Sequence, residues 1–272
     1  MGLDLMGVRK EVYMQSNTCI SIRVNGLEIE AEKDDNLLEL LQANSFNIPT
    51  LCYHKGVTPY GSCRLCSVEI KEENRSSIVT SCTYPVRREG IEVLTNSNEV
   101  VQIRKMIVKF LLSRTPEAKI IQKLADEYDV SNEERYETGS SSERCILCGL
   151  CVKVCNEVLQ KHAISFVSRG VDRKVAPPFE EPPEECIGCG ACSFVCPTGA
   201  IEEKITPDKE EKEIQPWQAK FKLIHCKSCG ENFLPDKTIN EVSGKTYQEN
   251  EFLGFCPDCK RKHVATNFNI PF

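Results

Sequence analysis

Apolar and polar residues alternate near the start of the chain, as they do in a β-hairpin. The alternation runs from Thr18 to Val24, meets Asn25-Gly26, and resumes over residues 27–31. Asn-Gly favours the type I′ turn that joins two antiparallel strands. Leucines then recur at helical spacing over about residues 36–43, after Asp34 and Asp35, either of which can cap a helix. The apolar leucines are Leu37, Leu38, Leu40 and Leu41. The pattern predicts a small mixed α and β domain.

Two more helices are predicted further along the chain. The first covers about residues 98–112, where the apolar positions are Val101, Ile107, Phe110 and Leu111. The second is expected to start at Thr115-Pro116-Glu117, a threonine cap with proline in the first turn, and to run to about Tyr128. The polar run from Ser131 to Glu143 reads as an exposed loop, with an interaction segment as the alternative.

The segment from Glu202 to Lys222 is rich in charge and contains Pro207 and Pro216. Such composition is typical of a linker or of a segment that wraps around a neighbouring domain. Trp217, the single tryptophan, is expected to pack in a core. No run of apolar residues reaches the length of a membrane-spanning helix.

The cysteine content distinguishes this chain from an ordinary globular protein. The chain has 17 cysteines among 272 residues, and its first ten residues show no secretory signal pattern. The cysteines are therefore read as metal ligands in a reducing compartment, which predicts a cytoplasmic protein. The length suggests two or three modules. A net charge of −6 argues against a nucleic-acid binder.

Eight cysteines between residues 145 and 196 form two runs with the same spacing. Each run is C-x2-C-x2-C-x3-C, and proline follows the second run. In two-cluster ferredoxins the fourth cysteine of each run binds the other cluster. One predicted [4Fe–4S] set is Cys145, Cys148, Cys151 and Cys196, and the other is Cys186, Cys189, Cys192 and Cys155. Glycines 149, 188 and 190 can supply the positive φ that such loops need. A pair of zinc sites is the weaker alternative, because zinc ligands usually come as two separated C-x2–4-C pairs.

A third set of cysteines has the spacing C-x10-C-x2-C-x15-C. Its members are Cys52, Cys63, Cys66 and Cys82, and they suit a [2Fe–2S] cluster, although the spacing is not that of plant-type ferredoxins. Strands are predicted at residues 67–70 and 78–81, and Gly61 and Ser62 can direct backbone N–H groups at the cluster. A zinc site is again the alternative. His54 is expected to be a loop residue, and Cys19 a small buried residue of the first strand.

The last four cysteines form two C-x2-C pairs, Cys226 with Cys229 and Cys256 with Cys259. Placed on two hairpin tips, these pairs give a tetrahedral four-sulfur site, a geometry that structural zinc and rubredoxin-like iron share. We favour a zinc ribbon, and leave iron or a further cluster open. His225 and His263 are expected at the surface.

Several motifs together resemble a known family. They are the segments 48–54, 61–69 and 81–83, the cysteine run 144–155, Ser168-Arg169-Gly170, and residues 192–200. Over about residues 17–202 the chain resembles the N-terminal region of the large iron–sulfur subunit of respiratory complex I. It is equally similar to the small diaphorase subunit of NAD-reducing hydrogenases. The resemblance implies an electron relay with a flavin- and NAD-binding partner.

The chain also departs from that family. Family members usually carry a further cluster held by one histidine and three cysteines, but residues 83–143 contain no cysteine or histidine, so that cluster is absent. We find no sequence sign of a molybdopterin domain, of a dinucleotide-binding G-x-G-x-x-G after a strand, or of a hydrogenase catalytic centre. The resemblance therefore implies a relay that lacks a site for substrate chemistry.

These features predict an α+β protein of four parts. They are a β-grasp [2Fe–2S] domain (1–96), a helical connector (97–140), a two-[4Fe–4S] ferredoxin-like domain (141–205), and a linker with a zinc-ribbon or rubredoxin-like module (206–272). We expect a non-catalytic electron-transfer subunit of an anaerobic, low-potential oxidoreductase. Its partners would be a flavin/NAD(P)H-binding subunit and a hydrogenase, formate dehydrogenase or other reductase. The alternatives are a soluble multi-cluster carrier and, less favoured, a zinc-rich regulatory protein.

Overall fold

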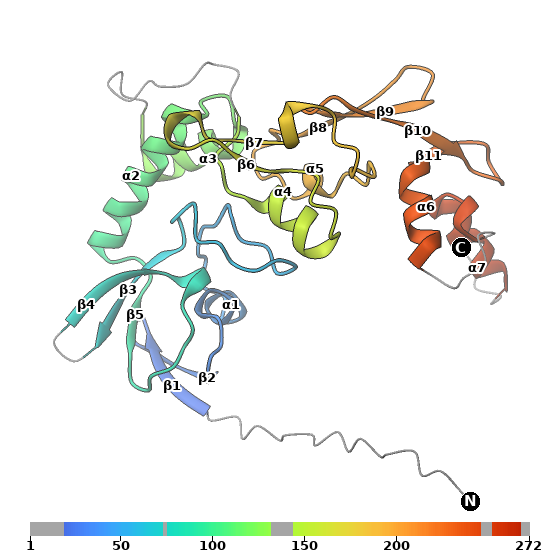
Figure 1. Ribbon diagram of the computed structural model, residues 1–272. Helices are drawn as coiled ribbons and strands as arrows, with labels where there is room; N and C mark the ends of the chain where they lie inside the picture. The colour runs from blue at the N-terminus through green and yellow to red at the C-terminus, as the bar shows by residue number, and fades with distance from the viewer. Residues whose placement is uncertain (1–18, 73–74, 132–143, 246–251, 268–272) are drawn as a thin grey trace, which may run out of the picture. The chain divides into compact units, whose positions relative to one another are not determined.

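The computed structural model describes residues 19–72, 75–131, 144–245 and 252–267. The chain divides into two compact units. The first comprises Met1–Ile48 and Ser67–Val100, and the second comprises Pro49–Cys66 and Val101–Phe272. Helices and strands occur in both, so the predicted mixture of α and β structure is confirmed (Figure 1).

The first unit is built on a five-stranded sheet with the order β2-β1-β5-β3-β4. Its strands are β1 (Cys19–Val24), β2 (Leu27–Glu32), β3 (Ser67–Glu72), β4 (Arg75–Thr80) and β5 (Glu92–Leu94). β1 and β5 run parallel, and the other neighbours are antiparallel. Asn25 and Gly26 both have positive φ, as the predicted turn requires. The helix α1 (Leu37–Ala43) buries Leu37, Leu38 and Leu41.

Two local predictions for this unit were wrong. The cap of α1 is Asn36, whose side-chain oxygen accepts hydrogen bonds from the backbone N–H groups of Leu38 and Glu39. Asp35 instead accepts one from the backbone N–H of Glu32. Cys19 lies in β1 as expected but is exposed. The pleat of β1 turns Ile20, Ile22 and Val24 inward, which places Cys19 on the other side at the strand's end.

The second unit contains the loop 49–66, all but the first three residues of the helix α2 (Asn98–Arg114), and the helix α3 (Lys119–Tyr128). The predicted start of α3 at Thr115 was too early. The Thr115 hydroxyl donates to the Leu111 carbonyl one turn back, so it belongs to the end of α2. Ala118 occupies the N-cap position of α3, where its side chain makes no capping hydrogen bond. Phe110, predicted on the apolar side of α2, is 53% exposed. Most of the predicted polar loop, residues 132–143, lies outside the described residues.

Short elements follow α3 and carry the eight central cysteines. They are α4 (Leu150–Lys153), η3 (Val154–Val158), β6 (Ser165–Val167), η4 (Gly170–Asp172), β7 (Lys174–Ala176), η5 (Pro178–Glu180) and α5 (Ala191–Phe194). β6 and β7 pair as an antiparallel hairpin. Gly149 and Gly190, which precede α4 and α5, have positive φ, as does Gly188.

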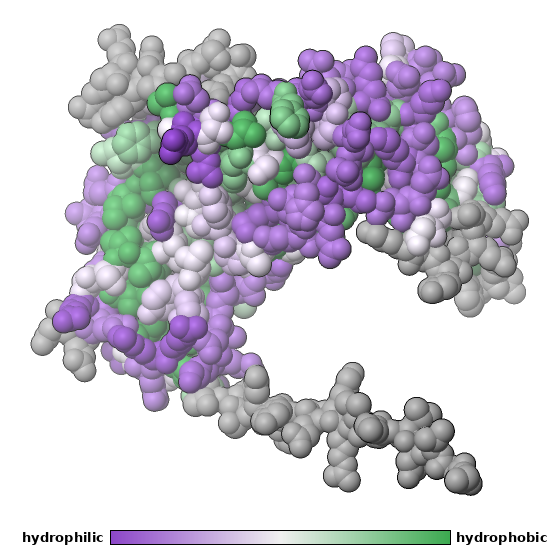
Figure 2. All heavy atoms as spheres, viewed as in Figure 1, coloured by the Kyte–Doolittle hydropathy of each residue, from purple (hydrophilic) through white to green (hydrophobic). Residues whose placement is uncertain are grey.

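The segment predicted as a linker or wrapping segment forms most of a second sheet. Its strands β8 (Glu202–Ile205), β9 (Glu211–Gln215), β10 (Ala219–His225) and β11 (Asn232–Pro235) have the order β11-β10-β9-β8. Ala219, Phe221 and Leu223 are buried, and the lysines between them are exposed. The visible surface over β9 and β10 is accordingly mostly hydrophilic (Figure 2). A linker is therefore excluded.

The described part of the chain ends in three short elements, α6 (Asp236–Lys245), η6 (Phe252–Gly254) and α7 (Pro257–Asn267). Within the described residues, no helix combines the length and the apolar character needed to cross a membrane.

Candidate metal centres

Four cysteines from distant parts of the sequence line one cavity of about 210 Å³. They are Cys145, Cys148, Cys151 and Cys196. The rest of the wall is mainly apolar and includes Val175, Ile201 and Trp217. The structure thus brings the fourth cysteine of the second run to the first three of the first run.

The complementary four cysteines line a narrower cavity of about 30 Å³. They are Cys155, Cys186, Cys189 and Cys192. Gly190 also lines it, and the Phe221 ring packs where a Cβ of the nearby Gly188 would lie. Larger residues at these two glycines would push side chains of the second sheet away from the cysteine loop. Apart from Lys161, the rest of the wall is apolar and includes Ile164, Ile214 and Trp217.

The thiols within each cavity disfavour one another's ionisation. Burial raises the pKa of Cys148 to about 12, and the neighbouring thiolates of Cys196 and Cys145 contribute to that rise. In the second cavity burial raises the pKa of Cys192 to about 12, again with neighbouring thiolates, Cys189 and Cys186, adding to the effect. Four thiolates crowded together, each partly or fully buried, need cations among them to be stable. Bound iron meets that need, so the donor sets fit iron–sulfur clusters.

Three of the predicted [2Fe–2S] ligands lie in the loop of the second unit. The backbone N–H of Cys63 donates to the Cys52 sulfur over 3.3 Å, and Cys66 is buried. The hydrogen bond with the Cys52 sulfur, together with burial, raises the pKa of Cys63. Cys82 belongs to the first unit, in the turn η1 (Ser81–Thr83), where its carbonyl accepts a hydrogen bond from Asn36. His54 is exposed and accepts a hydrogen bond from the backbone N–H of Gly56, in agreement with a role as a loop residue.

The loop that carries Cys52 and Cys63 shares a core with the first cavity. Cys52, Cys63, Cys148 and Leu150 belong to one buried cluster. The Cys52 thiolate also contributes to the raised pKa of Cys148. A cluster bound in this loop would therefore lie next to the first [4Fe–4S] site.

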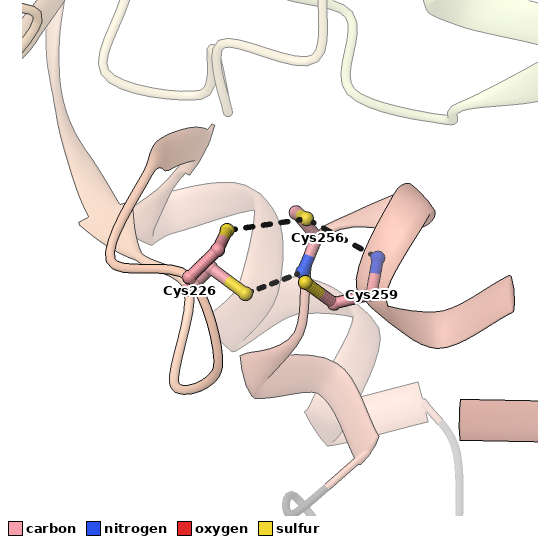
Figure 3. A group of neighbouring side chains, drawn as sticks. Cys226, Cys256 and Cys259 are labelled. Carbon is pink, nitrogen blue, oxygen red and sulfur yellow. Dashed lines mark hydrogen bonds between the residues drawn. The ribbon is translucent and has the colours of Figure 1, made fainter. Parts of the chain in front are cut away.

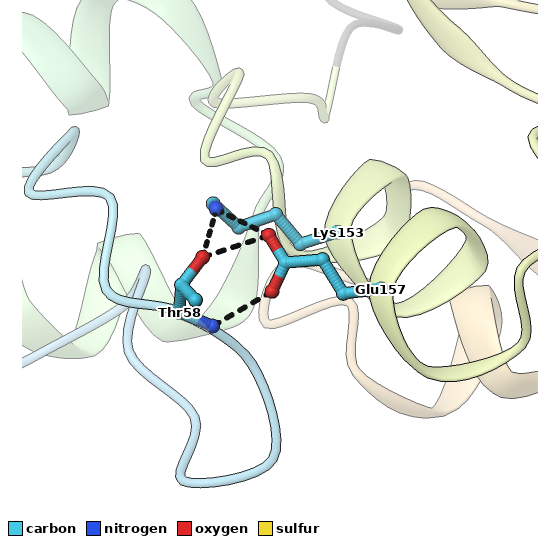
Figure 4. Close-up of polar contacts among 3 residues, drawn as sticks. All are labelled: Thr58, Lys153 and Glu157. Atoms are coloured by element: carbon cyan, nitrogen blue, oxygen red, sulfur yellow. Dashed lines mark hydrogen bonds and ion pairs between the residues drawn. The ribbon is translucent and has the colours of Figure 1, made fainter.

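A polar network holds this loop on the short helices that bear Cys151 and Cys155 (Figure 4). The Glu157 carboxylate accepts hydrogen bonds from the backbone N–H of Thr58 over 2.8 Å and from its hydroxyl over 2.7 Å. Lys153 Nζ donates to Glu157 over 2.7 Å and to the Thr58 hydroxyl over 2.6 Å. The hydrogen bonds from Lys153 and Thr58 lower the pKa of Glu157 to about 2. Sequence reasoning missed this network, because nothing local marks residues so distant in the chain as partners.

Replacing Glu157 with glutamine should loosen the loop. The amide loses the ion pair with Lys153 and accepts less strongly from Thr58, because hydrogen bonds to a charged acceptor are the stronger kind. We expect faster amide hydrogen exchange over residues 53–62 of E157Q than of the wild-type protein. Glu127→Gln, at an exposed position of α3, is the matched control. Equal exchange in the two variants would show that the network does not hold the loop.

A buried arginine supports the same loop from α2. Arg104 is 2% exposed, and its Nε donates to the Leu65 carbonyl over 3.0 Å. Leu65 lies between Cys63 and Cys66, so the guanidinium fixes the backbone of this C-x2-C pair. In the sequence, the only sign of this buried arginine is its position. Arg104 is a charged residue at a place where the helical spacing of apolar residues predicts a buried side chain.

The C-terminal cysteines form a compact four-sulfur site. The sulfur atoms of Cys226, Cys229, Cys256 and Cys259 all lie within 4.8 Å of one another. The sulfurs of Cys229 and Cys256 are 3.8 Å apart, the separation expected for two sulfurs about 2.3 Å from one tetrahedral metal ion. The first pair follows β10, and Gly230 after it has positive φ. The second pair was predicted on a hairpin tip, but it lies at the start of α7 (Figure 3).

Backbone N–H groups donate hydrogen bonds to the cysteine sulfurs of this site. Cys256 N donates to the Cys226 sulfur over 3.2 Å, and Cys259 N lies 3.5 Å from the Cys256 sulfur. Burial opposes ionisation of Cys226, but the N–H groups of Cys256, Cys229 and Ser228 outweigh it and lower the pKa of Cys226 to about 6. His225 and His263 are exposed, as predicted. The four sulfurs alone complete a tetrahedral donor set.

These sites define the chain as an iron–sulfur protein, and comparison with known proteins agrees. Residues 17–98 match the 2Fe-2S iron-sulfur cluster binding domain, and residues 144–200 match the 4Fe-4S dicluster domain. Both segments contain the cysteine sets described above. The residues after 200, including the second sheet and the C-terminal cysteines, lie outside both matches.

The relatives confirm the resemblance stated from the sequence. The chain is 32% identical over 207 residues to NADPH-Fe(3+) oxidoreductase subunit alpha of Geobacter sulfurreducens. This match covers 68% of this chain and 24% of that protein. It is 25% identical over 225 residues to the mitochondrial NADH-ubiquinone oxidoreductase 78 kDa subunit of Neurospora crassa, covering 74% and 29% of the two chains. The chain thus spans less than a third of each of these relatives.

A solved structure shares the fold. It is an NAD+-reducing [NiFe]-hydrogenase in the H2-reduced state, with a TM-score of 0.51 and 24% identity. The match covers 58% of this chain and 74% of the hydrogenase chain.

Proposed function

We propose that this chain is an electron-relay subunit of a larger oxidoreductase. The observation that carries the proposal is the closeness of the cysteine sets within the second unit. The two four-cysteine cavities share Trp217 as a wall, and the loop with Cys52 and Cys63 shares a core with Cys148. Clusters bound at these positions would exchange single electrons with little rearrangement. The described residues contribute cysteine ligands and apolar walls that exclude water.

The ligand assignments extend this proposal. Cys52, Cys63, Cys66 and Cys82 would hold the [2Fe–2S] cluster in a β-grasp domain. Each cavity of the ferredoxin-like domain would hold one [4Fe–4S] cluster, with Cys155 and Cys196 as the exchanged ligands. The apolar walls and the backbone N–H groups directed at sulfur would set the potentials. Since plant-type [2Fe–2S] centres have potentials of about −400 mV, low-potential couples suit the ends of the relay.

The partners are inferred from the relatives' names. These relatives act with NADPH, NADH or NAD+, and this chain has no recognisable dinucleotide motif in its sequence. A cytoplasmic flavin- and NAD(P)H-binding subunit would therefore deliver or receive electrons at one end. A hydrogenase, a formate dehydrogenase or another low-potential reductase would act at the other.

The C-terminal module would bind zinc. The sulfur separations suit one tetrahedral ion, and Cys229 of the site is exposed. Rubredoxin-like iron has the same geometry, so the metal itself must be measured.

Two experiments test the relay. Anaerobic affinity purification from the native host should recover this chain with a flavoprotein subunit and a reductase, and the isolated chain should not oxidise NADH or NADPH with a dye acceptor. Rapid oxidation by the isolated chain would contradict the proposal. Purification as a monomer that reduces several unrelated enzymes would instead favour a soluble carrier.

A further inference from the structure

One side chain lies against both four-cysteine cavities. Trp217 lines the cavity of Cys145, Cys148, Cys151 and Cys196, and it also lines the cavity of Cys155, Cys186, Cys189 and Cys192. It is only 6% exposed and packs in a core with Cys151, Cys155 and Ile214. It is also the one tryptophan of the chain.

Trp217 does not belong to the ferredoxin motif. It lies in the connection between β9 and β10, beyond the segment 144–200 that matches the dicluster domain. The sheet that positions it packs on the second cysteine loop, because the Phe221 ring lies against Gly188 and the Glu203 carboxylate against Gly190. Thr238 of α6 donates to the Ile187 carbonyl over 2.6 Å, which ties the module to the same loop.

We infer that Trp217 is the shared seal of both [4Fe–4S] sites, and that through it the second sheet sets the potentials of the two clusters together. The inference rests on the cluster assignment proposed above. The indole supplies a large apolar wall at both cavities and keeps water from both. No other tryptophan can take this position.

The direction of the effect follows from solvation. Reduction adds a negative charge to a cluster that four thiolates already make anionic. Water stabilises the more highly charged form, so burial disfavours the reduced state and water entry favours it. Truncating Trp217 admits water to both cavities. The midpoint potentials of both [4Fe–4S] clusters should therefore rise.

The test uses the full chain, purified anaerobically, with EPR-monitored redox titration of Trp217→Ala, Trp217→Phe and two single-cavity controls. Ile214 lines the second cavity and Val175 the first. Ile214→Ala should shift one [4Fe–4S] signal and Val175→Ala the other, whereas W217A should shift both upward. W217F, which keeps an aromatic wall, should shift both less. The [2Fe–2S] signal, whose ligands line neither cavity, reports correct folding.

A second readout is cluster loss in air. After timed exposure to air and anaerobic re-reduction, both [4Fe–4S] EPR signals should be lost faster in W217A than in the wild-type protein, and only one of them faster in I214A. The wild-type tryptophan emission should rise as either [4Fe–4S] cluster is removed, because the clusters absorb at its emission wavelengths.

The outcomes separate this inference from the proposed function. A wild-type protein without two [4Fe–4S] signals would refute the cluster assignment itself. If the wild-type protein gives two signals and W217A moves only one of them, or neither, the shared seal is refuted and the relay stands. If W217A lacks the [2Fe–2S] signal that reports folding, W217F is judged by the same criterion in its place.

Discussion

Replacing Cys155 with alanine should abolish one [4Fe–4S] cluster and leave the other in place. Cys155 lines the cavity of Cys186, Cys189 and Cys192, although it belongs to the first run in sequence. Removing it leaves three ligands at that cavity and four at its neighbour. We expect iron to fall from about ten to about six per chain, since each cubane holds four, with one EPR signal lost. Cys196→Ala should remove the other signal.

In the crossed arrangement, the fourth cysteine of each run binds the cluster of the other run. Comparing which EPR signal is lost in pairs of variants tests this arrangement. C155A and Cys186→Ala should lose the same EPR signal, and C196A and Cys145→Ala the other. Cys19→Ala is the matched control, because Cys19 is exposed in the first sheet and lines neither cavity. If C155A lost the signal that C145A loses, each run would bind its own cluster, and the ligand sets proposed here would be wrong.

Replacing Arg104 with methionine should weaken the loop around Cys63 and Cys66. The variant loses the hydrogen bond from Nε to the Leu65 carbonyl, and a buried carbonyl left without that donor costs about 1–3 kcal/mol. Removing a buried positive charge beside this loop should also lower the potential of the [2Fe–2S] cluster, because the cation favours the more negative, reduced form. Anaerobic thermal unfolding and EPR-monitored titration measure the two effects.

Arg104→Lys separates charge from geometry. It keeps a cation but lacks the planar guanidinium, so we expect lower stability with a smaller change in potential. Unchanged stability and potential in R104M would show that Arg104 does not support the cluster loop. The two [4Fe–4S] signals provide the internal reference.

Cluster ligation imposes spacing directly on the chain, so the cysteines could be grouped into candidate sets from the sequence alone. The structure places the fourth cysteine of each central run, Cys155 and Cys196, at the other run's cavity. The first hairpin was also predictable, because Asn25-Gly26 fixes the turn and the pleat repeats every second residue. Asn36 was missed as a cap because two aspartates precede it, and either could have served.

Longer-range features could not be read from local pattern. The sheet β8–β11 was not predicted, because its many charged residues and its prolines are equally typical of a linker. Only the packing of its side chains on Gly188 and Gly190 shows which part of the chain this sheet contacts. The Thr58–Lys153–Glu157 network joins residues almost a hundred positions apart. The start of α7 at the second C-terminal cysteine pair was likewise unseen, because C-x2-C fits a hairpin tip and a helix start alike.

The most direct test of the relay is metal analysis with EPR on the anaerobically purified, dithionite-reduced chain. We expect about ten irons and about one zinc per chain, with one [2Fe–2S] and two [4Fe–4S] signals. About eleven irons without zinc would keep the relay and place iron in the C-terminal site. A colourless protein that holds zinc at the cysteine sets and gives no EPR signal would contradict the relay.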